Sequence, residues 1–130
     1  MTDEDLIQIA SRLVGEFRTS EDCMAGGVAA ALVTRTGHVH TGICFDTACS
    51  LGFCAEHAAI ADMLKARESE IATIVAVDGS GILPPCGRCR ELIRQINPVN
   101  SSTRVIIGEG RVAQLSELLP FATAASVRLP

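Results

Sequence analysis

Two short stretches of the chain carry side chains that could do chemistry together. Cys54 and Glu56 lie two residues apart, and Cys86 and Cys89 form a Pro-Cys-x-x-Cys motif. Each stretch lies where a helix is expected to begin, and the positive end of a helix lowers the pKa of a nearby thiol. Three thiolates can hold a zinc ion and leave its fourth position open for water. We therefore expect Cys54, Cys86 and Cys89 to bind zinc.

The carboxylate of Glu56 is placed to act on water at that open position without binding the metal itself. Zinc lowers the pKa of bound water to about 7, which makes a nucleophile available at neutral pH. A single carboxylate beside the metal can carry a proton from water to a ring nitrogen and then to a leaving amine. A three-ligand zinc site with a nearby glutamate and this cysteine motif is typical of the zinc deaminases of nucleobases. Asp46 precedes Glu56 in a loop and suits contact with a substrate.

Length and composition predict one globular domain over residues 1–130 and limit its partners. The residues are 48% hydrophobic and 20% charged, which allows a buried core. The net charge of −4 argues against binding of DNA or RNA, and no run approaches the roughly 18 apolar residues of a membrane span. The N-terminus is acidic where a secretory signal is basic, so we expect a cytoplasmic protein. In that reducing compartment the six cysteines are interpreted as metal ligands or buried thiols.

Hydrophobic periodicity predicts alternating helices and strands. A first helix, capped by Thr2, is expected to continue through Phe17, and a loop is expected over 18–27. Further helices are predicted over 54–66, 86–96 and 116–119, and strands over 28–34, 39–44, 71–77 and 103–107. The helix over 54–66 is apolar on nearly every side and is expected to be buried. This order predicts an α/β protein whose sheet has helices on both faces.

The chemistry-bearing stretches resemble a known family. The run C-A-E-H-A-A-I from residue 54 and the run P-C-G-R-C-R from residue 85 resemble the small cytidine deaminases, including their blasticidin-S deaminase relatives. Residues 28–32, 42–54 and 117–120 are similar to further family segments. The resemblance implies a three-layer α/β/α fold with a mixed sheet of about five strands, and a homotetramer whose active sites are completed across subunits. It also implies that Glu56 is the proton shuttle and that the backbone around Ala55 and Pro84 contacts the base.

Several positions depart from the family pattern around the expected substrate. Cys44 stands where the family usually has an Asn for the sugar hydroxyls, and Asp46 stands where cytidine deaminases have Glu. Gly26 replaces the Phe that opens the first-strand motif, and Phe121 follows Pro120 directly, where the family's aromatic residue lies a few residues later. The expected substrate-binding residues are Cys44, Phe45, Asp46 and Ala55.

Two basic residues are expected to support the metal ligands from outside. His57 stands where the family usually has the Arg that bonds the zinc thiolates. A hydrogen-bond donor there would reduce the negative charge of three thiolates on one Zn²⁺, and Arg90 could do the same from the third helix.

The function predicted from these residues is zinc-dependent hydrolytic deamination of a free cytosine nucleoside, within pyrimidine salvage. Cytidine or deoxycytidine is the first choice, and blasticidin S or another modified cytosine nucleoside is the alternative. Two other classes remain open. A structural zinc module would need a fourth ligand from His57, Cys49 or Cys44. A thiol redox protein would use Cys86 and Cys89 alone and would leave Glu56 unexplained. His38 and His40 share a strand face and are interpreted as surface histidines.

Overall fold

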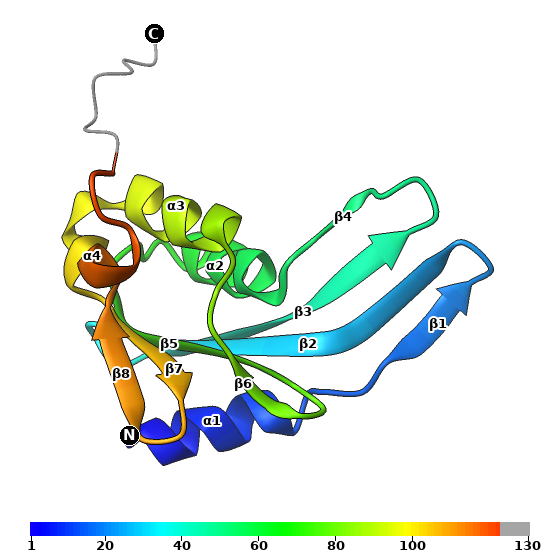
Figure 1. The fold of residues 1–130 in the computed structure, drawn as a ribbon, viewed down its shortest axis with the longest axis horizontal. Coiled ribbons are helices and arrows are strands. Elements are labelled where there is room, and N and C mark those ends of the chain that lie inside the picture. The colour runs from blue at the N-terminus through cyan, green and yellow to red at the C-terminus, as the bar shows by residue number, and fades with distance from the viewer. Residues whose placement is uncertain (123–130) are drawn as a thin grey trace, which may run out of the picture.

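The computed structural model describes residues 1–122 and places a mixed sheet between layers of helices (Figure 1). The helices are α1 (Asp3–Ser11), α2 (Ala55–Lys65), α3 (Gly87–Ile96) and α4 (Leu115–Leu118), with a 3₁₀ turn, η1 (Pro98–Ser102). The strands are β1 (Phe17–Ser20), β2 (Cys23–Thr34), β3 (Val39–Thr47), β4 (Gly52–Phe53), β5 (Ile71–Asp78), β6 (Gly81–Leu83), β7 (Arg104–Gly108) and β8 (Arg111–Gln114). Among the described residues, no helix has the length and apolar character needed to cross a membrane.

The sheet has the order β4-β3-β2-β5-β7-β8, with β1 paired to β2 and β6 paired to β5. All of these pairs are antiparallel except β5 with β7, which are parallel, so the sheet is mixed as predicted. It contains eight strands where about five were expected, because β1, β4 and β6 are short additions to its edges and ends. The strands β1 to β4 extend as an arm beyond the helices (Figure 1).

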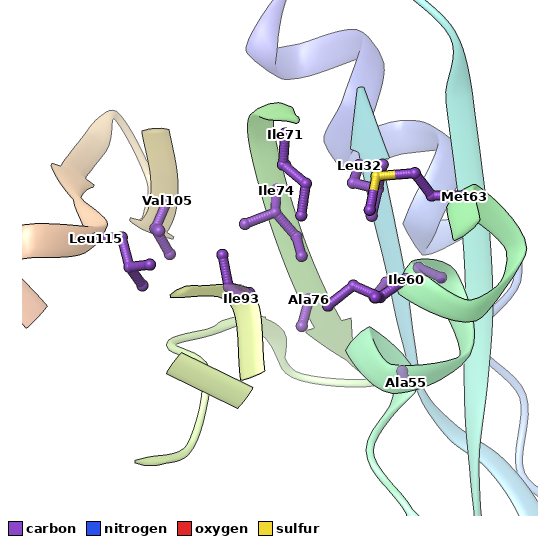
Figure 2. Close-up of a cluster of buried hydrophobic side chains, with 12 residues drawn as sticks. Leu32, Ala55, Ile60, Met63, Ile71, Ile74, Ala76, Ile93, Val105 and Leu115 are labelled. Atoms are coloured by element: carbon purple, nitrogen blue, oxygen red, sulfur yellow. The ribbon is translucent and has the colours of Figure 1, made fainter. Parts of the chain in front are cut away.

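Alternating residues of β2 and β5 divide the core into two halves, as the two-residue period of a strand requires. Ala31 and Val75 face α1, whose Leu6 and Ala10 are buried against them. The other face carries α2 and α3 in a larger cluster (Figure 2). That cluster is Ala30, Leu32, Ala55, Ala59, Ile60, Met63, Ile71, Ile74, Ala76, Ile93, Val105 and Leu115.

Helix α2 lies against β3 with almost no space between the two backbones. Gly42 is the point of contact: an added Cβ would lie 2.5 Å from the Ala59 nitrogen and 2.8 Å from the Ala55 carbonyl oxygen. Ala58 closes the same gap, so small residues on both elements permit the approach. This contact fixes the start of α2, where Glu56 lies, relative to the end of β3.

The N-terminal prediction was partly wrong. Helix α1 ends at Ser11, and Phe17 begins strand β1, where it pairs with Ala25. The predicted loop over 18–27 is instead β1 and the first part of β2. Gly26 has a φ of 84° at an irregularity of the β2–β3 register, so it marks a bulge within the strand. The Gly15 N–H donates to the Gly26 carbonyl, which holds the chain after α1 against this bulge.

Other differences are smaller. Helix α2 is buried on one face only, and Leu64 on its outer face is 39% exposed, because the helix lies on the sheet with nothing described on its other side. Strands β4, β6 and β8 and the turn η1 were not predicted. The remaining helices and strands lie within a few residues of their predicted positions.

The C-terminal end of α2 is tied to the β2–β3 turn by polar groups. Glu68 follows the helix and accepts hydrogen bonds from Thr36 and from His38 Nδ1, the latter at 2.8 Å. These bonds, that from Thr36 first, lower the pKa of Glu68 to about 2 from an ordinary value of 4.5.

Replacing Gly42 by Ala is expected to destabilise the protein by about 1–3 kcal/mol, because the added methyl group overpacks the contact between β3 and α2. The measurement is the urea midpoint. Gly79→Ala is the matched control, because nothing lies within 4 Å of a Cβ there. Equal midpoints for the two variants would contradict the close contact.

Replacing Glu68 by Gln should weaken the dependence of the unfolding free energy on pH between pH 4.5 and about 2. The folded-state pKa lies below the ordinary value, so the ionised carboxylate stabilises the fold above pH 4.5, and this stabilisation is lost as the pH falls towards about 2. Wild type and variant should therefore differ most above this window and converge at its acid end in urea unfolding. The exposed neighbour Glu70, changed to Gln, is the control and should follow the wild type.

Candidate active site

Three cysteine sulfurs meet where α2 and α3 begin. Cys54 is the residue immediately before α2, Cys86 is the residue immediately before α3, and Cys89 is in the first turn of α3. The Cys86 Sγ lies 3.7 Å from the Cys54 Sγ and 3.6 Å from the Cys89 Sγ. Sulfurs bound tetrahedrally to one zinc at about 2.3 Å are separated by about 3.8 Å. The three thiols therefore have the spacing of a zinc site before any rearrangement.

The electrostatic environment of these thiols also fits a cation. Burial raises the pKa of Cys54 and of Cys89, and for Cys89 the charge of Glu56 raises it further. Burial acts in the same direction on Cys86, but the backbone N–H of Cys89 and neighbouring donors outweigh it and lower the pKa of Cys86 overall. The predicted lowering of a thiol pKa at a helix start is therefore found at Cys86. At Cys54 burial outweighs it, and the pKa is raised. A metal ion would offset the repulsion between clustered thiolates as it displaces their protons.

Glu56 lies in the first turn of α2 with only 5% of its surface exposed. Burial raises the pKa of its carboxyl group, since the charged form loses contact with water. Such a carboxyl group holds a proton more readily than an exposed one.

A pocket of about 360 Å³ opens above the thiols. Its lining includes Cys54, Cys86 and Glu56, together with three of the four residues predicted to bind substrate: Cys44, Asp46 and Ala55. The pocket is further lined by Val28, Ser50, Gly52, Phe53, Ala76, Leu83, Pro84 and Arg88.

The fourth predicted residue, Phe45, is not among the lining residues. Its ring instead packs edge-on against Phe53, with the ring centres 4.7 Å apart, and Phe53 itself lines the pocket. Cys44 was predicted to contact the sugar, but its sulfur already accepts a hydrogen bond from the Val28 N–H at 3.2 Å. Asp46 lies in β3 and not in the predicted loop. It is exposed, and its carboxylate has no hydrogen-bond or ion-pair partner among the described residues.

His57 and Arg88 lie on the same side of the site. Burial, and then the charge of Arg88, lower the pKa of His57, which favours its neutral form. The ring centre of His57 is 6.0 Å from that of Phe53, and its Nε2 is buried without a hydrogen-bond partner among the described residues. Arg88 was not predicted to line the pocket. Its position between the two cysteines of the Cys-x-x-Cys motif is the signal that could have indicated this.

Arg90 makes contacts that the sequence did not suggest. Its Nε donates to the Pro85 carbonyl at 2.8 Å, and its Nη1 donates to the Leu118 carbonyl at 3.1 Å. The guanidinium group therefore holds the backbone just before Cys86 and ties it to the end of α4.

The proposed fourth protein ligands for a structural zinc do not join the cluster. In the part of the chain that the structure describes, the group of donors within 4.8 Å of one another consists of the three thiols alone. His57, Cys49 and Cys44 are outside it. Three protein ligands with an open position facing a pocket are the arrangement of a catalytic zinc site.

The α/β/α fold and the three-thiol metal centre beside a buried glutamate together indicate a metal-dependent hydrolase. Comparisons with known proteins lead to the same class. A family model described as the cytidine and deoxycytidylate deaminase zinc-binding region matches residues 1–108. A cytidine deaminase from Halalkalibacterium halodurans is 34% identical over 104 residues, covering 75% of this chain and 77% of that protein.

Solved structures give the same result. The cytidine deaminase from Burkholderia pseudomallei has a TM-score of 0.76 and 31% identity, over 95% of this chain and 100% of that one. The enzyme from Mycobacterium tuberculosis has a TM-score of 0.78 and 26% identity, over 95% and 99% of the two chains. The chain belongs to the cytidine and deoxycytidylate deaminase family and is a zinc-dependent aminohydrolase.

Zinc content should depend on the clustered thiols and not on the other cysteines. Cys54→Ser and Cys89→Ser are each expected to leave the purified protein with much less zinc than wild type, measured by atomic emission, because two thiolates retain the ion poorly. Cys49→Ser, at an exposed thiol outside the cluster, is the matched control and should keep its zinc. Zinc loss in the control, or none in the cluster variants, would contradict the assignment.

Proposed function

We propose that the protein hydrolyses the exocyclic amine of a free cytosine nucleoside, cytidine or deoxycytidine, and releases ammonia. The observation that carries this proposal is the position of the buried Glu56 carboxyl group on the wall of a pocket that also exposes Cys54 and Cys86. The relatives named cytidine deaminase support the choice of substrate.

Cys54, Cys86 and Cys89 are assigned to hold the metal. When bound, zinc supplies Lewis-acid activation of water at neutral pH. Cys54 and Cys86 immediately precede α2 and α3, and Cys89 lies in the first turn of α3. The two helix backbones therefore hold the thiols beside the pocket.

Glu56 is assigned the proton transfers. Its carboxylate accepts a proton from the attacking water and delivers it to the ring nitrogen. It then takes the second proton, from the hydroxyl now on the ring carbon, and delivers it to the amine, which leaves as ammonia while the carbonyl forms. The raised pKa that burial gives this group suits a residue that must be protonated for part of the cycle.

The base and sugar are assigned to different walls of the pocket. The buried Ala55 and the neighbouring Pro84 present backbone to the base, while the exposed Asp46 carboxylate accepts a hydrogen bond from a sugar hydroxyl. Cys44 lies between them as an apolar wall whose sulfur is already engaged by Val28. Phe45 acts indirectly, by packing against Phe53.

Two further residues are assigned supporting roles. His57, which follows Glu56, is assigned to donate a hydrogen bond to a zinc thiolate once zinc is bound, as its position in the motif suggests; its buried Nε2 has no partner among the described residues. Arg90 holds the Pro85 carbonyl and so positions the loop that ends at Cys86.

We also propose a cytoplasmic homotetramer that serves pyrimidine salvage, as the family resemblance implies. Free thiols at all six cysteines suit a reducing compartment. The projecting arm exposes large apolar side chains that suit burial between subunits: Phe17 is 52% exposed and Leu51 is 68% exposed.

Glu56→Gln should lower kcat by about 10²–10⁴-fold with zinc retained, because the amide cannot transfer protons. The assay is ammonia release from cytidine, deoxycytidine, cytosine and blasticidin S, with zinc content measured on the same samples. Glu109→Gln, in an exposed turn, is the matched control and should leave activity unchanged.

The panel also decides the substrate. Turnover of cytidine or deoxycytidine, absent in the Glu56 variant, supports the proposal, and turnover of blasticidin S alone would replace the substrate. A zinc-loaded wild type that is silent on all four compounds would overturn the proposed function.

A further inference from the structure

A second group of metal-ligating side chains lies at the far end of α2 from the thiols. His38 and His40 come from β3 and the turn before it, Asp62 comes from α2, and Glu68 follows that helix. Sequence alone offered two histidines on one strand face and no partner for them. The structure adds two carboxylates, and we refer to these four residues as the β3–α2 polar cluster.

His40 is held in the orientation of a metal ligand. Its side chain is only 10% exposed, and its Nδ1 lies 2.7 Å from the Asp62 carboxylate. A carboxylate on one ring nitrogen fixes the proton there and leaves the lone pair of the other nitrogen free, which is the arrangement found behind histidine ligands of metals. The other nitrogen, Nε2, is buried and has no hydrogen-bond partner among the described residues.

The free nitrogen of His40 faces Glu68. Nε2 lies 3.7 Å from the Glu68 Oε2, too far for a hydrogen bond but close to the separation of two donors that share one metal ion. Donors bound tetrahedrally at about 2.0–2.2 Å are about 3.3–3.6 Å apart. His38 Nδ1 lies 2.8 Å from the same oxygen.

We propose that His40, Glu68 and His38 form a second site for a divalent transition-metal ion of the zinc class, with Asp62 orienting His40. Two imidazoles and one carboxylate are ligands that zinc accepts, whereas calcium and magnesium prefer oxygen alone. Unlike the three thiols, these donors are not all within 4.8 Å of one another. His38 is the ligand that must move, and its ring, 71% exposed, is free to turn.

Binding exchanges existing bonds for metal bonds. The hydrogen bond between His38 Nδ1 and Glu68 is broken, and the neutral imidazole coordinates through Nδ1 with its proton on Nε2, so no net proton is released. Thr36 keeps its hydrogen bond to the other oxygen of Glu68, which remains outside the coordination sphere.

The site would act as a clamp rather than as a second catalytic centre. It joins β3 to the segment after α2, and both elements carry pocket residues at their other ends, Asp46 on β3 and Glu56 on α2. An ion that binds only the folded state stabilises it by RT ln(1 + c/Kd), where c is the concentration of free ion, so the unfolding temperature rises with that concentration.

The test is the zinc content of the holoprotein after equilibrium dialysis against free zinc, together with the melting temperature with and without that zinc. Wild type and Glu70→Gln should bind one ion more than the thiol site holds and should melt at higher temperature with zinc. His40→Gln and Glu68→Gln should lose that additional ion and the thermal shift while keeping deaminase activity. His38→Gln, at an exposed position that folding tolerates, should do the same.

A wild type that binds no additional ion would overturn the inference, and so would an additional ion that all three cluster variants retain. Cys54→Ser separates this test from that of the proposed function. That variant should lose the ion of the thiol site and keep the ion of the β3–α2 polar cluster.

Discussion

The site depends on how closely α2 approaches the sheet. Gly42 and the alanines opposite it let the two backbones touch, and this contact sets the height of Cys54 and Glu56 above β3. Interiors are close-packed and adjust little, so a helix seated on glycine and alanine has one position and not a range of them. The alanine-rich composition of this helix, which contributes little to hydrophobic stabilisation, is therefore what fixes the positions of Cys54 and Glu56, while Cys86 and Cys89 are positioned by α3.

Burial then shifts the pKa values of the acidic groups that α2 and α3 position. Burial raises the pKa of both the Glu56 carboxyl group and the Cys89 thiol, and the charge of Glu56 raises the pKa of Cys89 further. A divalent cation would offset the charge of the thiolates and leave the Glu56 carboxyl group beside the pocket able to exchange a proton. Apolar side chains, among them Phe53, also line the pocket beside these groups.

Much of this arrangement could be predicted from the sequence because local rules were sufficient. The Pro-Cys-x-x-Cys motif marks a helix start by its proline and its spacing, and β5 is recognisable as a buried strand from its β-branched residues. The first helix was predicted too long because Leu13, Val14 and Phe17 keep helical spacing. Phe17 instead pairs with Ala25 in the sheet, and the spacing of apolar residues carries no information about such a pairing.

The same limit explains the site residues that were missed or placed differently. Arg90 was expected near a thiolate, and its actual partners, Pro85 and Leu118, are carbonyls, which every residue carries and no motif distinguishes. The two carboxylates beside His38 and His40 come from another element, so no pattern within β3 could reveal them. Pairings between distant segments must be seen in three dimensions.

The bond from Arg90 to Leu118 has a consequence for how the protein is made. All three thiols precede β7, β8 and α4 in the chain and so leave the ribosome before them, yet the backbone before Cys86 is also held by a hydrogen bond to the end of α4. With elongation at roughly 5–20 residues per second, the nascent chain passes through a period in which the thiols are present but their loop is not held. In that interval the loop that carries Cys86 lacks a hydrogen bond that later fixes it, so the metal ligands reach their final geometry only after α4 has joined the fold.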